Sequence, residues 1–271
     1  MDYKDILFDM NKRLDGAAYI TINRPHVMNA FTGETIEEIY DAILTAAEEP
    51  TVGVIVLTGA GDKAFSAGGD VKWEKATRES YSRSPSPDIR EAMRKSPKPI
   101  LAAVKGYAVG GGHWLHYFAD LTIAAENAIF GQNGARVGSP AGGYQVSYLS
   151  RIVGEKKARE IWYLCRRYTA AEALEMGLVN WVVPLEGFDD AVDAIVSELL
   201  ERSPTVLSLL KFSFDQAHDY LRSYSETFIQ RALAPDFPGS AESLEGANAF
   251  LEKRPPNFAP YRRGPSGSQA D

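Results

Sequence analysis

The stretch Lys105-Gly-Tyr-Ala-Val-Gly-Gly-Gly-His-Trp114 lies near the middle of the chain and decides its fold. An apolar run at 99–104 precedes it and is typical of a buried strand, whereas residues 113–120 have the composition of a helix. Three glycines between a strand and a helix expose backbone N–H groups at a helix N-terminus, which favours negative charge. The same glycines can instead serve close packing, and their spacing fits neither a dinucleotide fingerprint nor a phosphate loop.

A second turn of small residues lies upstream, at Ala64-Phe-Ser-Ala-Gly-Gly-Asp70. It follows an apolar run at 52–58, which is typical of a strand covered on both faces. Two such turns can each point one N–H group at the same oxygen, which is the geometry of an oxyanion hole. The sequence alone does not show that the two turns meet.

The remaining patterns predict an α/β fold of one large core with a helical appendage. Further strands are expected at 6–9, 17–22, 121–125, 128–134 and 179–183, and helices at 32–48, 88–95, 145–153, 156–166 and 169–176. The polar, proline-containing stretch 71–87 is predicted to be a loop that covers the substrate. Only helices are expected after residue 188, at 189–202, 204–218, 219–233 and 241–253. This pattern predicts a core at 1–188, a C-terminal helical region at 189–263 and a disordered tail at 264–271.

Composition excludes several classes of protein. The chain has 271 residues, a formal net charge of −7 and one cysteine, so neither a nucleic-acid partner nor an intramolecular disulfide is expected. Cys165 lies in an apolar stretch and is predicted to be a core thiol. We find no apolar run of membrane-spanning length, no signal-peptide pattern at the N-terminus and no cluster with metal-ligand spacing. A cytoplasmic protein without a membrane partner is expected.

The two turns, their order and their spacing resemble the crotonase (enoyl-CoA hydratase/isomerase) superfamily along nearly the whole chain. The matching pieces are 23–25, 29–31, 64–70, 97–99, 106–112, 120–125, 130–132 and 173–179. Segments 111–116, 127–134, 151–166 and 245–254 are most similar to 1,4-dihydroxy-2-naphthoyl-CoA synthase and 2-ketocyclohexanecarboxyl-CoA hydrolase. The resemblance implies the crotonase-type β/α spiral with a C-terminal helical trimerisation region, assembled as a homotrimer or as a dimer of trimers.

The resemblance also implies an acyl-CoA site. The N–H groups of Gly69 and Gly111 would form the oxyanion hole, where losing one donor typically costs about 3–4 kcal/mol of barrier. Contacts to the substrate and CoA are expected from Ala67, Gly68, Asp70, Tyr107, Trp114 and Lys253. Asp70 has an equally strong structural interpretation, as a cap for the segment that follows it. Coenzyme A would be present as part of the substrate, and no permanently bound cofactor is expected.

The departures from the family pattern concern the reaction. A hydratase of this superfamily has glutamates where this chain has Trp114 and Gly134, and neither residue exchanges a proton. The two most similar enzymes have an aspartate at the position of Ala141 and a tyrosine at the position of Pro238. The remaining polar candidates for catalysis are Ser139, Tyr144 and Gln145, each of which has an equally good interpretation as a packing or capping residue.

Three residues match an anion pocket of the naphthoyl-CoA synthase, which holds a bicarbonate that acts as base: Gln132, Gly134 and Trp162. A bound anion would therefore supply a missing carboxylate. His113 and His116 are close to this region in the sequence, but the resemblance assigns the site-facing position of their helix to Trp114. Both histidines are predicted to pack away from the site.

The sequence thus predicts an acyl-CoA enzyme that stabilises a thioester enolate while it forms or cleaves a C–C bond in a β-oxo or cyclic acyl-CoA. Ring-opening hydrolysis is slightly favoured over ring closure because the aspartate and tyrosine of the synthase are missing, although the hydrolase shares both. An enoyl-CoA hydratase or isomerase with an atypical base is the first alternative. A CoA-thioester-binding protein without catalysis is the second.

Overall fold

The computed structural model describes residues 3–77, 88–139, 143–225 and 239–261, with backbone only from residue 216 to 225. Its larger sheet has six strands in the order β1-β2-β3-β5-β7-β10. They are β1 (Ile6–Met10), β2 (Ala17–Ile22), β3 (Val54–Gly59), β5 (Ile100–Val104), β7 (Leu121–Ala125) and β10 (Trp181–Val183). β1 runs antiparallel to β2, and each later neighbour is parallel. The predicted strands of this sheet are confirmed, with shifts of one or two residues at some ends.

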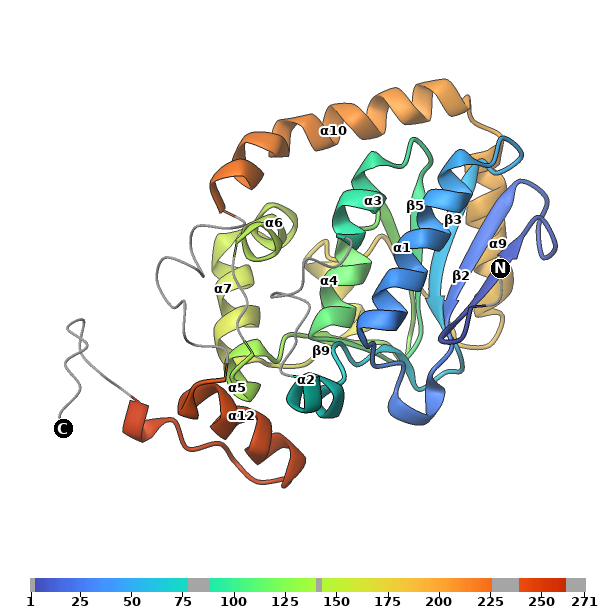
Figure 1. Ribbon diagram of the computed structural model, residues 1–271. Coiled ribbons are helices and arrows are strands. Elements are labelled where there is room, and N and C mark those ends of the chain that lie inside the picture. The colour runs from blue at the N-terminus through green and yellow to red at the C-terminus, as the bar shows by residue number, and fades with distance from the viewer. Residues whose placement is uncertain (1–2, 78–87, 140–142, 226–238, 262–271) are drawn as a thin grey trace.

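Helices cover both faces of this sheet, which explains its continuous apolar runs. On β3, Ile55 and Leu57 pack toward α1 (Gly33–Glu48), whereas Val54 and Val56 pack toward α9 (Phe188–Leu200). α1 begins at a capping box between Thr32 and Thr35. α9 is the first helix of the predicted C-terminal helical region, and its buried residues Phe188, Val192 and Val196 pack against the large sheet. It lies along one face of that sheet (Figure 1).

The smaller sheet positions the two glycine turns. Its strands follow the order β4 (Ala64–Ser66), β6 (Tyr107–Val109), β8 (Ile129–Gly131) and β9 (Tyr168–Thr169). β4 and β6 are parallel neighbours, with Ser66 paired to Ala108. The turns that follow them therefore leave the sheet at the same edge, where the carboxyl ends of parallel strands commonly place a ligand. The strand directly before the three glycines is β6, which the sequence analysis missed, and not the predicted strand at 99–104.

The remaining helices surround the sheets (Figure 1). They are α3 (Ile89–Lys95), α4 (Gly111–Tyr117), α5 (Gly134–Val137), α6 (Tyr144–Val153), α7 (Glu155–Leu164), α8 (Ala170–Glu175), α10 (Pro204–Ser225) and α12 (Ala241–Leu251), with 3₁₀ turns η1 (Pro25–Val27) and η2 (Ala259–Tyr261). α10 is one helix where two were predicted, at 204–218 and 219–233, and the end of the second prediction falls outside the described residues. No helix of the described segments combines the length and hydropathy needed to cross a membrane.

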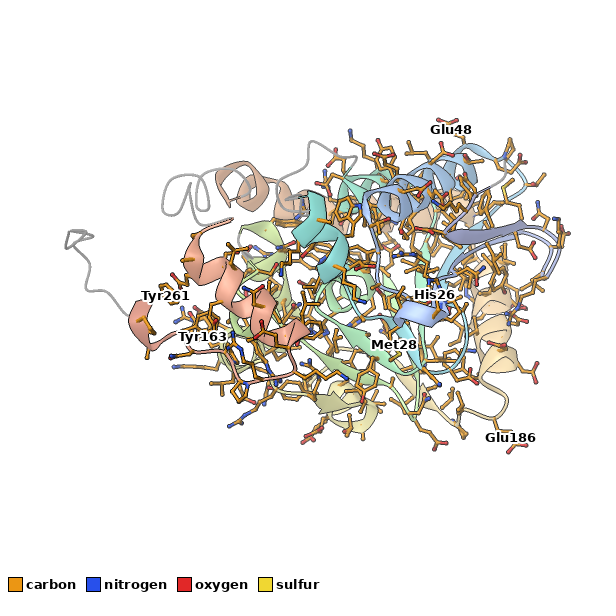
Figure 2. All side chains as sticks on the ribbon, turned by 60° about the horizontal axis from the view of Figure 1, so that its bottom comes forward. His26, Met28, Glu48, Tyr163, Glu186 and Tyr261 are labelled. Carbon is orange, nitrogen blue, oxygen red and sulfur yellow. The ribbon has the colours of Figure 1, made fainter. Side chains whose placement is uncertain are left out.

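The first part of the predicted covering loop is a helix, α2 (Val71–Thr77). Asp70 caps it, because its Oδ1 accepts from the backbone N–H groups of Lys72 at 3.1 Å and Trp73 at 3.2 Å. Lys75 Nζ donates to Asn248 Oδ1 at 2.8 Å, which joins α2 to α12, and these helices lie side by side on one face of the molecule (Figures 1 and 2). The cap and this contact explain a helix that apolar periodicity does not predict.

Candidate active site

The first turn presents the N–H group of Gly69. Phe31 forms a parallel bridge with Gly69, in which its N–H donates to Gly68 O at 2.9 Å and its carbonyl accepts from the N–H of Asp70 at 2.9 Å. Successive amides of an extended chain point in opposite directions, so the N–H of Gly69 faces away from Phe31. No described residue accepts from it.

The second turn presents the N–H group of Gly111, the first residue of α4. Gly110 precedes the helix at φ +56°, and its own N–H donates to Gly131 O at 3.0 Å. The first amides of a helix have no acceptor within it. Among the described residues, the N–H of Gly111 has no acceptor from elsewhere either.

The two turns approach so closely that neither has room for a side chain. A Cβ atom on Gly68 would lie 2.6 Å from the Gly111 nitrogen, and one on Gly111 would lie 2.1 Å from Cζ of Phe31. One on Gly112 would lie 2.1 Å from the carbonyl oxygen of Ser66. The glycines therefore allow the two turns to pack closely and also leave their backbone N–H groups accessible. Both roles that the sequence suggested for them apply.

Asn29 fixes the first turn from below. It is buried, and its Nδ2 donates to Ala60 O at 3.0 Å and Ala64 O at 2.7 Å. The backbone carbonyl of Asn29 accepts from the Ser66 hydroxyl at 2.7 Å. Arg24 adds an ion pair to Asp70, with 3.6 Å between Nη2 and Oδ2. The family motifs at 23–25 and 29–31 thus act as supports for the site.

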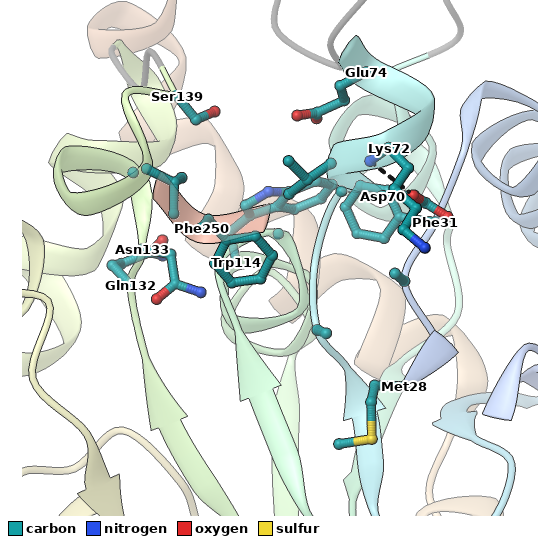
Figure 3. Close-up of a pocket in the computed structure, with 18 of the residues that line it drawn as sticks. Met28, Phe31, Asp70, Lys72, Glu74, Trp114, Gln132, Asn133, Ser139 and Phe250 are labelled. Atoms are coloured by element: carbon teal, nitrogen blue, oxygen red, sulfur yellow. Dashed lines mark hydrogen bonds between the residues drawn. The ribbon is translucent and has the colours of Figure 1, made fainter. Parts of the chain in front are cut away.

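Both donors border a cavity of about 360 Å³ (Figure 3). Most predicted site residues line it: Ala67, Gly69, Asp70, Gly111, Trp114, Gln132, Gly134, Ser139 and Trp162. Further lining residues come from the segment 27–31 and from α2, α5 and α12. The apolar residues among them include Met28, Phe31, Val137 and Phe250. The cavity therefore joins a polar edge at the donors to an apolar interior.

Four predicted site residues do not line this cavity. Gly68 supports the turn from beneath, Tyr107 is largely exposed on β6, and Lys253 is exposed just after α12. Tyr144 is buried against Phe118 and Tyr148 and does not line the cavity, whereas its neighbour Gln145 does. Ala141 and Pro238 fall outside the described residues.

The sequence analysis missed one carboxylate in this cavity, that of Glu74. Figure 3 shows it projecting from α2 into the space above Trp114. Burial, and then the neighbouring charge of Asp70, raise the pKa of Glu74 to about 7. A sequence signal was available, since Asp70 is a good N-cap and a helix begun there places Glu74 one turn beyond the oxyanion glycines.

The two histidines of α4 pack away from the cavity, as predicted. Both are fully buried, and His113 Nδ1 lies 3.2 Å from His116 Nε2. Burial, and then the charge of Arg167, lower the pKa of His113 to about 3. The result is a neutral pair of histidines packed at a tilt against Phe130, within the core.

Two buried donors of the predicted anion pocket lack an acceptor. Gln132 Nε2 and Trp162 Nε1 belong to residues that are 2% and 7% exposed, and no described atom accepts from either. Both side chains line the cavity beside Gly134. An unpaired buried donor is costly, so these groups are suited to an oxygen-bearing ligand.

Comparisons with known proteins agree with this architecture. The family model described as enoyl-CoA hydratase/isomerase matches residues 12–260. An enoyl-CoA hydratase/isomerase from Xanthobacter autotrophicus Py2 is 31% identical with a TM-score of 0.81, and the match covers 93% of this chain and 94% of that one. A methylmalonyl-CoA decarboxylase, solved in complex with 2-nitronate-propionyl-CoA, is 27% identical with a TM-score of 0.82, over 95% and 99% of the two chains.

A third structure, a monofunctional enoyl-CoA isomerase from M. smegmatis, is 29% identical with a TM-score of 0.66, over 79% of this chain and 94% of that one. The names of these three proteins refer to different reactions on CoA thioesters, so the fold does not select one of them. The match over residues 12–260 does establish the family. This chain belongs to the enoyl-CoA hydratase/isomerase family of the crotonase superfamily, and it has that family's acyl-CoA enzyme fold.

Proposed function

We propose that this enzyme makes or breaks a C–C bond beside the thioester carbonyl of a β-oxo or cyclic acyl-CoA, and that ring-opening hydrolysis is favoured over ring closure. The observation that carries the proposal is the pair of N–H groups on Gly69 and Gly111, which border one cavity without a described acceptor. Such donors stabilise an oxygen on which charge develops. An enolate oxygen is formed when a carbon or a proton leaves the α-position of a thioester.

Two features of the cavity support this reaction over hydration. Trp114 and Gly134 line it where a hydratase of the superfamily has its two water-activating glutamates. Phe31, Val137 and Phe250 give the interior an apolar surface that suits a carbocyclic acyl group. In ring opening, water adds to the β-oxo carbon and the C–C bond breaks toward the thioester. The electron pair then forms the enolate, and a proton finally reaches the α-carbon.

A panel of CoA thioesters tests the proposal. We would incubate the enzyme with cyclic β-oxo, aromatic succinyl and enoyl thioesters in D₂O and follow products and isotope content by mass spectrometry. A ring-opened acid that carries α-deuterium is the expected product. A thioester that binds but neither reacts nor exchanges deuterium would contradict the proposal and favour a binding protein without catalysis.

The carboxylate of Glu74 favours one second candidate, an enoyl-CoA isomerase with an atypical base. Isomerisation needs one group that removes a proton and returns it two carbons away, and a single carboxylate at the cavity suffices. Hydration is less well supported, because it needs one group to activate water and another to protonate the α-carbon. The enoyl thioesters in the panel separate these outcomes, since isomerisation leaves the mass in H₂O unchanged whereas hydration adds one water.

We also propose that Gln132, Gly134 and Trp162 hold a small oxyanion such as bicarbonate. The two unpaired donors, Gln132 Nε2 and Trp162 Nε1, support this assignment because an anion oxygen would accept from both. Bicarbonate would supply a basic oxygen at this wall when it is bound. The residues of the chain would orient it and shield it from bulk water.

Bicarbonate should therefore raise the thermal stability of the protein. At a concentration about 100 times its Kd, a ligand of the native state adds about 2.7 kcal/mol to the free energy of unfolding. We expect a rise in Tm in CO₂-free buffer on addition of bicarbonate, and no rise in Trp162→Phe, which lacks the N–H. Trp181→Phe, at an exposed position on β10, is the matched control. An equal response of all three proteins would contradict the pocket.

A further inference from the structure

We propose that Glu74 is the catalytic residue that takes up and returns the α-proton of the bound acyl-CoA. This inference rests on the proposed function, because it assumes that a thioester oxygen binds at Gly69 and Gly111. It assigns proton transfer to a residue of α2, because neither Trp114 nor Gly134 can exchange a proton. The assignment holds for C–C cleavage and for isomerisation alike, since both pass through the same enolate.

The contacts of α2 hold Glu74 toward the cavity. Trp73 packs against the start of α1, where a Cβ on Gly33 would lie 3.1 Å from its indole ring. Lys75 is bonded to Asn248 of α12 at 2.8 Å, and Asp70 caps the first turn. With its two neighbours committed to other helices, the side chain of Glu74 borders the cavity (Figure 3).

The carboxylate lies beside Gly69, the residue that carries one oxyanion donor. Its Oε1 is 2.3 Å from the position that a Cβ on Gly69 would occupy, so it is in contact with the Gly69 backbone. The α-carbon of a thioester is about 2.4 Å from its carbonyl oxygen, as standard bond lengths dictate. An oxygen bound to the N–H of Gly69 therefore brings the α-carbon into the neighbourhood of Glu74.

Within the part of the chain that the structure describes, no side-chain donor or cation contacts this carboxylate, although it is half-buried. The charge that acts on Glu74 is that of another carboxylate, Asp70, which itself forms an ion pair with Arg24. A buried carboxylate with a pKa of about 7 costs stability but is well matched to proton transfer near neutral pH.

The proposed step conserves charge and atoms. The ionised carboxylate of Glu74 removes the α-proton, the C–H electron pair moves into a C=C bond, and the thioester oxygen becomes negative at Gly69 and Gly111. In the reverse direction the protonated carboxyl returns the proton to the α-carbon. In ring opening, Glu74 takes its proton from the water that adds to the β-oxo carbon, and after the C–C bond breaks it gives this proton to the α-carbon of the enolate.

Saturated thioesters test Glu74 apart from the net reaction. Cyclohexanecarbonyl-CoA and butanoyl-CoA can exchange an α-proton but cannot isomerise, add water or open a ring. We would measure deuterium uptake in D₂O by mass spectrometry, in CO₂-free buffer and again with bicarbonate, and obtain the thioester Kd by calorimetry. We expect Glu74→Gln to slow exchange by at least about 100-fold with a Kd within threefold of wild type. Glu175→Gln, at an exposed position on α8, should match wild type.

The pH profile gives a second readout. Exchange by the wild type should rise with pH and level off above about 7, because only the ionised Glu74 accepts a proton. Glu74→Asp, which retains a titrating carboxyl, should keep a rise at lower rate, and Glu74→Gln should lose it. Exchange by folded Glu74→Gln within threefold of wild type would overturn the role of Glu74 alone. Absence of exchange by the wild type on a thioester that binds would overturn the enolate proposal as well.

Discussion

We expect Gly111→Pro to slow α-proton exchange on a bound acyl-CoA by about 10²- to 10³-fold. Proline removes the N–H group that the start of α4 presents to the cavity. Gly111 is the first residue of that helix, where proline is otherwise well tolerated because the amide has no acceptor within the helix. Deuterium uptake by cyclohexanecarbonyl-CoA measures the effect directly.

The structure adds a steric complication to this substitution. Any Cβ at position 111 would lie 2.1 Å from Cζ of Phe31, so proline changes packing as well as hydrogen bonding. A shorter side chain at position 31 relieves that contact. We therefore compare Phe31→Leu/Gly111→Pro with Phe31→Leu/Gly111→Ala, which share the added Cβ and differ in the N–H.

Exchange should survive within about tenfold in the alanine pair and be lost in the proline pair, because one backbone donor separates them. Circular dichroism should report the same helix content for both proteins. Equal exchange rates in the two pairs would mean that the N–H of Gly111 does not bind the thioester oxygen. Loss of exchange in both would assign the effect to packing around Phe31.

Gly112→Ala should lower the free energy of unfolding by about 3 kcal/mol or more. Its Cβ would lie 2.1 Å from the carbonyl oxygen and 2.8 Å from the carbonyl carbon of Ser66. Both atoms belong to the backbone of β4, which is paired to β6, so no rotamer change can relieve the overlap. Urea denaturation followed by tryptophan fluorescence measures the loss.

Gly61→Ala provides the comparison for this effect. Gly61 has φ +75°, and no atom lies within 4 Å of its ideal Cβ position. Alanine there adds only the backbone strain of the left-handed region, about 1–3 kcal/mol. If Gly112→Ala were no more destabilising than Gly61→Ala, the close approach of the two turns would be wrong.

The central strands of the large sheet, β3, β5 and β7, were predictable because they are apolar on both faces. β7 was predicted at its observed bounds from Leu121 to Ala125, since helices on either side remove any alternation of polar residues. β6 was not predicted, because its three residues lie between Gly106 and Gly110, and so short a run between glycines is typical of a turn. Its partners, β4 and β8, lie far from it in sequence, and their pairing creates the strand.

The glycine turns of the candidate site were predicted from the sequence, whereas its buried carboxylate, Glu74, was not. The two small-residue turns were identified because they follow apolar runs, and the resemblance to the family then assigned the donor role to Gly69 and Gly111. Glu74 was missed because a charged residue in a polar segment looks solvated, and its burial arises from contacts of α2 with distant helices. Periodicity over seven residues is too short to show such a helix, so the cap at Asp70 was the stronger signal.

The order of synthesis separates the two sides of the cavity. The oxyanion donors belong to Gly69 and Gly111, whereas Phe250 and Leu251 of α12 line the same cavity from much further along the sequence. The turns that present the donors therefore emerge from the ribosome well before the α12 residues that complete the cavity lining.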